Sequence, residues 1–335
     1  MKQLSWKDIV AKYQQPHLGR SIWQLINTLV PYAVLWYLMY LSLGISYWLT
    51  LGLAMVAGGL LVRIFIIFHD CGHLSFFKSQ KVNRFWGFIT GVLTFTPHDY
   101  WWNEHAQHHA SAGNLDNRGI GDIWTMTVRE YTKASRMTRL RYRLLRNPLC
   151  LFLIGPFFMF VIARRIPNFK AGWKKCRSTI LTNIGIVVVG VLASALIGWK
   201  AYLLIQLPVL MVAASAGVWL FYVQHQFEGV YWERQPGWDY VTEALHGSSF
   251  YKLPKILQWF TGNIGFHHIH HLSPRIPNYY LERCYNENVM FQQIKPITLL
   301  SSLKSLKFRL WDEQNHQLVS FREFKKRVLS GLIKV

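Results

Sequence analysis

Eight of the 14 histidines in this 335-residue sequence fall into three closely spaced clusters. The clusters are H-x-x-x-H (His69, His73), H-x-x-H-H (His105, His108, His109) and a second H-x-x-H-H (His267, His270, His271). On a helix, spacings of three and four residues place side chains on one face. Each cluster can therefore present two or three imidazoles to one point, and imidazole binds zinc, copper, iron and nickel.

The number of histidines narrows the choice of metal. A structural zinc site needs four ligands and usually includes cysteine, so eight clustered histidines indicate two ions. Soluble di-iron bundles use Glu-x-x-His motifs with partner glutamates. Glu243-x-x-His246 and Glu313-x-x-His316 occur here, but the partner glutamates do not. An all-histidine pair of ions beside an apolar interior suits oxygen activation, so we predict two non-haem iron ions with O2 as co-substrate.

Long uncharged segments must position these clusters. Hydrophobic residues make up 51% of the chain, and a spanning helix needs about 20 of them in a row. Residues 25–43, 47–68, 180–199 and 201–223 qualify. The first pair is separated by Gly44, Ile45 and Ser46, and the second by Lys200, which predicts two helical hairpins. Residues 86–96 are too short to cross, and residues 149–163 contain Pro156.

The distribution of charge predicts the topology. The net charge is +21, and the Lys and Arg residues flank the apolar runs. This arrangement favours an anionic lipid surface as the partner. No motif supports binding of nucleic acid. Lys and Arg concentrate on the cytoplasmic side of membrane proteins. When the basic segments that flank the spans are placed on that side, Lys200 is the only basic residue left on the outer side. Both flanks of residues 149–163 are basic, so this segment should dip into the membrane or lie along its surface.

These observations predict an all-α integral membrane protein with one domain, residues 1–335. Four transmembrane helices in two hairpins would carry a cytoplasmic helical cap made of residues 69–178 and 224–335. Both termini would be cytoplasmic. An even number of crossings separates the three clusters, so all of them reach the cap. The four cysteines form no Cys-x-x-Cys pair, which fits reduced thiols on that side.

The order of the three clusters resembles that of the membrane fatty acid desaturase family. The clusters read HDCGH, HAQHH and HHIHH. Neighbouring segments resemble the bacterial acyl-lipid desaturases, namely NLDNRG with GDIW, QHQFE and GNIGF. The resemblance covers about residues 60 to 280. It implies a fatty acid desaturase with a di-iron site.

The resemblance also implies further site residues. His225, directly after the fourth span, would be a ninth ligand, unless it only caps the helix. Asn263 would reach iron directly or through water, unless it is a turn residue. Asp70 and Glu104 would orient histidines, although Glu104 could simply face solvent. We expect the remaining residues near the motifs to have packing or surface roles: Cys71, His268, His17, His98 and His316.

The implied reaction places a cis double bond in a membrane acyl lipid, with O2 and two external electrons. The sequence has no haem-binding domain and no G-x-G-x-x-G fingerprint, so a ferredoxin or similar carrier would supply the electrons. The lipid head group would rest near residues 129–146. Three alternatives stay open: a hydroxylase or ketolase of a carotenoid, sterol or alkane; a metal transporter; and a structural or sensor protein.

Overall fold

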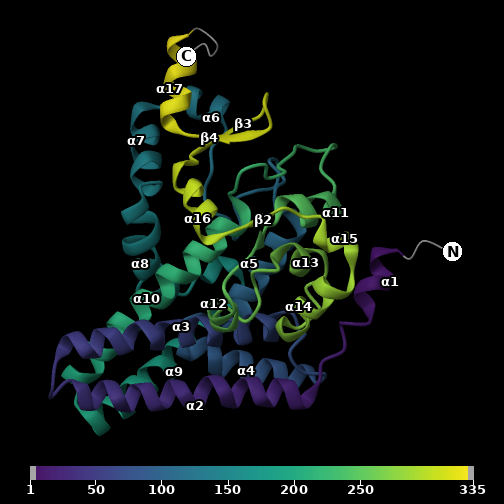
Figure 1. Cartoon of the computed structure of the whole chain (residues 1–335). Helices are drawn as coiled ribbons and strands as arrows, with labels where there is room; N and C mark the ends of the chain where they lie inside the picture. The colour runs from purple at the N-terminus through teal and green to yellow at the C-terminus, as the bar shows by residue number, and fades with distance from the viewer. Residues whose placement is uncertain (1–4, 331–335) are drawn as a thin grey trace.

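Four long apolar helices form the body of the protein (Figure 1). The computed structural model describes residues 5–330. The long helices are α2 (Leu18–Ser42), α3 (Tyr47–Gly72), α9 (Trp173–Ile197) and α10 (Trp199–His225). With 25 to 27 residues each, they measure about 37–40 Å, which is enough to cross a bilayer core of about 30 Å. The prediction of an integral membrane protein with four spans is confirmed.

The long helices form the two predicted hairpins. Residues 43–46 join α2 to α3. The second reversal was predicted at Lys200, and that position is wrong, because α9 ends at Ile197 and Gly198 makes the break. Gly198 has a φ of 85°, a left-handed conformation that costs glycine little because it has no Cβ. Lys200 lies in the first turn of α10.

Three of the helices continue past the apolar runs toward the histidines. Helix α3 extends four residues beyond Phe68, α10 ends at His225, and α9 begins at Trp173. The apolar pattern marks only the part of a helix that meets lipid, whereas the extensions of α3 and α10 carry buried residues such as His69 and His225. As a result, His69 lies in the last turn of α3 and His73 caps that helix. The start of α9 remains exposed at Trp173.

Helix α3 is the centre of the bundle and contacts α2, α10 and α4 (Gln80–Leu93). Of its most apolar stretch 61% is buried, against 6% for α9, whose surface is left to lipid. Small residues allow the close approach of α3 to α10, as is usual between membrane helices. A Cβ atom on Gly58 would come within 2.5 Å of Val212 Cγ1.

Helices α4 and α5 (His98–Ser111) carry the second cluster back to the end of the bundle. The apolar run 86–96 forms the end of α4 and the turn before α5, and it does not cross. Helix α4 packs on α3 and α9, and Val92 fits against Gly185 of α9. Helix α5 then places His105, His108 and His109 beside the end of α3.

Residues 136–165 form a bent arm. Helix α7 (Arg136–Leu145) is followed by a π-helix (Cys150–Ile154), α8 (Gly155–Val161) and a 3-10 turn (Ala163–Arg165). The two halves meet at 63°, and the second half exposes Ile154 and Phe158. A sharp bend with apolar side chains outside is the geometry of a re-entrant or interfacial segment, as the flanking charges predicted.

The rest of the chain forms the cap, and it is mainly helical. Its core surrounds α13 and includes Phe250, Phe266 and Ile269. It also holds two short sheets, a parallel pair β1–β2 and an antiparallel pair β3–β4. The elements are α1 (Trp6–Ala11), α6 (Val128–Lys133), a 3-10 turn (Phe169–Ala171), α11 (Tyr240–Thr242), a π-helix (Glu243–Gly247), β1 (Phe250–Tyr251), α12 (Lys255–Phe260), α13 (His267–Leu272), α14 (Asn278–Glu287), α15 (Val289–Gln292), β2 (Pro296–Ile297), α16 (Leu299–Ser302), a 3-10 turn (Leu303–Lys307), β3 (Leu310–Asp312), β4 (Gln317–Val319) and α17 (Phe321–Leu329).

The close contact between α3 and α10 predicts a stability effect. Gly58→Ala should destabilise the bundle by about 1–3 kcal/mol, because the new methyl group overpacks against Val212. Gly52→Ala in the same helix is the matched control, since nothing lies within 4 Å of its added Cβ. Thermal unfolding in detergent measures both variants. Equal melting temperatures would contradict this packing.

Candidate metal centre

Four segments bring the histidines of all three clusters to one place. They are the end of α3, helix α5, the end of α10 and helix α13. One group, called group one here, consists of His69, His73, His105, His109 and His270. A second, group two, contains His108, His225 and His271. Within each group, one ligand atom of every residue lies within 4.8 Å of all the others.

The ninth histidine joins group two through a neighbour. His267 Nε2 lies 3.0 Å from His225 Nε2, and His225 Nε2 lies 3.1 Å from His108 Nε2. Group one has the same spacing, with His109 Nε2 3.1 Å from His105 Nε2 and 3.0 Å from His270 Nε2. Two nitrogens bound at right angles to one ion, at about 2.1 Å each, lie about 3.0 Å apart. The spacing of the imidazoles therefore fits two metal ions.

The imidazoles of the cap are buried and uncharged. Burial lowers their pKa values well below the ordinary range, and neighbouring imidazoles lower them further. This holds for His73, His105, His109, His267, His270 and His271. Metal ions bind the neutral form of imidazole, so these rings do not have to release a proton when a metal binds.

Buried ring nitrogens without partners give a second indication of a metal. Among the described residues, His73 Nε2 and His271 Nε2 are buried and accept or donate no hydrogen bond. A buried polar atom without a partner costs about 1–3 kcal/mol. A bound cation would satisfy such nitrogens, and the donor set is therefore suited to a metal rather than to a packed core.

Carboxylates support a histidine in each group. Asp70 Oδ1 lies 3.2 Å from His69 Nδ1, and its Oδ2 accepts hydrogen bonds from the backbone and side-chain nitrogens of Asn278 at 2.7 and 2.8 Å. Asp122 Oδ1 lies 2.6 Å from His108 Nδ1. A carboxylate at Nδ1 holds the proton there and directs Nε2 to the metal. The orienting role was predicted for Asp70 but missed for Asp122, which follows His109 by 13 residues in an irregular loop.

Glu243 is the third carboxylate at the site. It is fully buried, and its Oε2 lies 3.4 Å from His271 Nδ1. Burial raises the pKa of Glu243 to about 8. The sequence drew attention to Glu243 only through the motif Glu243-x-x-His246, and the side chain faces a histidine instead of completing that motif.

The other residues singled out in the sequence lie away from the two groups or have other partners. Asn263 has a φ of 58°, and its amide accepts a hydrogen bond from Gln258 Nε2 and donates one to Asn278 O. Glu104 forms an ion pair with Arg164 and does not orient a histidine. His98 was expected at the surface and is buried, because it packs between α4 and Trp102. Of the rest, Cys71 and His268 are buried, His17 accepts a hydrogen bond from the first turn of α2, and His316 is exposed.

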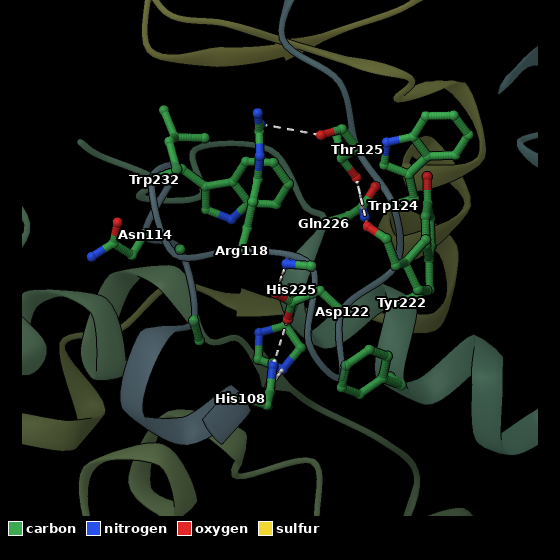
Figure 2. A pocket seen from close by; sticks show the side chains of 16 residues that line it. His108, Asn114, Arg118, Asp122, Trp124, Thr125, Tyr222, His225, Gln226 and Trp232 are labelled. Atoms are coloured by element: carbon green, nitrogen blue, oxygen red, sulfur yellow. Dashed lines mark hydrogen bonds and ion pairs between the residues drawn. The ribbon is translucent and has the colours of Figure 1, made fainter. Parts of the chain in front are cut away.

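A cavity of about 260 Å³ opens beside group two (Figure 2). His108 and His225 form one end of it. Phe221 packs against both histidines, and Ile123, Leu115, Trp124 and Trp232 add apolar lining. Asp122, Arg118 and Asn114 are polar groups in the lining, so the cavity has a mixed and mainly apolar wall.

Arg146 is not available for a lipid head group, contrary to the prediction for residues 129–146. It is 1% exposed, and its guanidinium donates hydrogen bonds to Gln226 Oε1 and Phe308 O. Its role is to tie the arm to the end of α10 and to the C-terminal segment. Four exposed arginines remain in that stretch: Arg129, Arg136, Arg141 and Arg143.

Comparison with known proteins places these features in a family. Residues 46–295 match the family model described as fatty acid desaturase. A fatty acid desaturase of Bacillus subtilis is 52% identical over 324 residues, which cover 97% of this chain and 92% of that protein.

More distant relatives have more specific names. An sn-1 acyl-lipid omega-3 desaturase (ferredoxin) of Synechocystis is 26% identical over 72% of this chain and 66% of its own length. An sn-1 oleoyl-lipid 12-desaturase of the same organism is 25% identical over 71% of this chain and 69% of its own length.

The grouping of the histidines predicts the effect of single substitutions. His270→Ala removes a nitrogen from group one, and His225→Ala removes one from group two. Each should weaken one bound ion by more than the roughly 10- to 100-fold that loss of an orienting partner costs. Metal content per chain, measured by mass spectrometry after dialysis, tests this.

His316→Ala is the control, since that side chain is 63% exposed. It should leave the metal content unchanged. Two ions retained at wild-type affinity in both site variants would contradict the grouping.

Proposed function

The chain belongs to the fatty acid desaturase family, and from this membership we propose that its nine histidines would hold two iron ions and that the protein desaturates a membrane acyl lipid. The protein is an oxidoreductase of acyl chains. The proposed reaction removes two hydrogens from adjacent methylene carbons, consumes O2, two external electrons and two protons, and leaves a cis double bond and two water molecules.

One observation carries the proposal for the metal centre. Imidazole nitrogens from four segments converge in two groups, and neighbouring nitrogens from α5, α10 and α13 lie 3.0–3.1 Å apart. Acid–base side chains cannot break an unactivated C–H bond, so a cofactor must do it. When bound, two iron ions would supply the activation of O2 that this chemistry requires. Group one would hold one ion and group two, with His267, the other; Asn263 would be a further ligand directly or through water.

The protein's own residues would position and shield the centre. Neutral imidazoles add no charge, so the bound ions keep their positive charge. Asp70 and Asp122 fix the rings of His69 and His108 from behind. The histidines themselves are nearly all buried, which keeps water from the reacting atoms.

The cavity beside group two supports a route for the acyl chain. Phe221 and Ile123 would contact methylene groups next to His108 and His225. Arg118 and Asn114, which also line the cavity, would face the polar part of the lipid. The names of the sn-1 acyl-lipid relatives support an acyl lipid as the substrate.

The electron donor would be a separate carrier. The relatives from Synechocystis and Nostoc are named as ferredoxin enzymes, which supports a ferredoxin or similar protein. The net charge of +21 would favour docking of an acidic carrier.

The orientation in the membrane is part of the proposal. The cap, the metal centre and both termini would be cytoplasmic, and residues 1–335 would form one domain. The positive charges that flank the spans on the cap side support this orientation.

The position of the histidines favours an enzyme over a metal transporter. Transporter sites lie near the middle of the membrane on broken helices. Here the ligands lie at the ends of α3 and α10 and in the cap, beside the cavity. A hydroxylase or ketolase would use the same centre, and the acyl-lipid desaturase relatives favour desaturation.

The first test is the product. Expression in a host whose fatty acids are known should produce a new monounsaturated chain, and gas chromatography with mass spectrometry should locate its double bond. His108→Ala and His270→Ala should reduce the product below detection, while His316→Ala should not. A hydroxylated or keto product, or no product at all, would overturn the desaturase proposal.

The second test is the donor. Purified enzyme should turn over with reduced ferredoxin, and raising the salt from about 0.05 to about 0.5 M should slow it several-fold, because salt screens surface charges. A small neutral reductant serves as the control and should show no such dependence. Salt-independent turnover with ferredoxin would contradict charge-guided docking.

A further inference from the structure

Glu243 is the most unusual charged group near the metal centre. Its side chain is completely buried, and so is that of His271, the only ion-pair partner it has among residues 5–330. A buried carboxylate without a cation is costly, and natural proteins rarely retain one. Its place in the fold therefore requires an explanation.

The backbone makes room for this side chain. Two glycines lie against it, and a Cβ atom on Gly113 or Gly247 would come within 3.2 or 3.0 Å of Glu243 Cγ. Glu243 also begins a five-residue π-helix, an insertion that often occurs at functional sites. Gly113 follows α5, which carries the second histidine cluster. The surroundings of Glu243 are thus built around the carboxyl group.

Two polar atoms without hydrogen-bond partners lie close together at this point. Glu243 Oε2 and His271 Nδ1 are both buried without a hydrogen bond, and they lie 3.4 Å apart. The other carboxyl oxygen, Oε1, accepts a hydrogen bond from Ser248 Oγ at 3.3 Å. Oε2 is therefore free to accept a hydrogen bond from Nδ1 of His271.

We propose that Glu243 is a positioning residue for the metal of group two. It accepts the Nδ1 proton of His271, which leaves Nε2 of that ring to bind the ion. The role rests on the proposed function, since it presupposes a metal in group two. It repeats the contact of Asp122 with His108 in the same group, so two carboxylates support group two and one, Asp70, supports group one.

The proposal predicts that the two metal sites differ in how their affinity for the ion depends on Glu243. The positive charge of a bound ion favours the ionised form of the buried Glu243 carboxyl. Two of the four histidines of group two would then have a carboxylate behind them, which stabilises the cation there. Loss of such a partner weakens metal binding by about 10- to 100-fold. Only the ion of group two should respond to a change at Glu243.

Three variants separate the roles of shape, hydrogen bond and charge. Glu243→Gln keeps the size and an acceptor oxygen but removes the charge. Glu243→Leu removes the acceptor as well. Glu228→Gln is the control, because that carboxylate is 69% exposed and pairs with Lys304.

The measurement is an anaerobic titration of the metal-free, full-length protein with ferrous ion, followed by Mössbauer spectroscopy of the iron-57 form. In Glu243→Leu one of two ions should bind about 10- to 100-fold more weakly. Glu243→Gln should bind both ions but shift the signal of one. The signal that changes should be the one that His225→Ala abolishes, because His225 belongs to group two.

The outcomes distinguish this inference from the proposed function. Wild-type signals for both ions in Glu243→Gln, with wild-type affinity in Glu243→Leu, would overturn the role of Glu243. Changes confined to the ion that His270→Ala removes would also overturn it. Failure of the wild-type protein to bind two ferrous ions would instead overturn the di-iron proposal.

Discussion

The convergence of buried imidazole nitrogens is the constraint on which the rest of the structure depends. Nitrogens from four segments, up to 202 residues apart between His69 and His271, must meet in two groups, in which the nearest nitrogens are 3.0 Å apart. Two long helices, α3 and α10, therefore extend beyond the apolar core of the bundle, and α5 and α13 close over their ends. The bend of the arm and the burial of Arg146 follow from the same need, because they fix the cap to the end of α10.

Burial gives these imidazoles their chemical character and creates a cost. Away from water the rings stay neutral, which suits metal binding. Their unpaired nitrogens and the carboxyl of Glu243 are unfavourable unless something satisfies them. Metal ions on one side of the rings and carboxylates on the other would satisfy both. Three of the rings, those of His69, His108 and His271, would thus lie between a carboxylate and a metal ion.

Much of the fold and of the site could be predicted from the sequence, because the physical signals are local. Long apolar runs marked the four spans, since lipid requires uninterrupted hydrophobic surface. Spacings of three and four residues marked the clusters, since they place imidazoles on one helical face. The flanking charges predicted that residues 149–163 dip into the membrane or lie along its surface, and the bend of 63° at this segment is compatible with that prediction. The reversal at Gly198 was misplaced at Lys200, because hydropathy detects a charge but not a backbone conformation.

The sequence by itself determined which histidines form the centre and that it lies at the end of the membrane helices. Only the tertiary structure decided how the nine rings divide, with His108 and His109, neighbours in the chain, in different groups. The reason is that consecutive residues on a helix point about 100° apart, so they face different partners. The tertiary structure also revealed Asp122 and Glu243, whose contacts with His108 and His271 depend on an irregular loop and a π-helix. No local pattern encodes such contacts, because they arise from packing between segments distant in the chain.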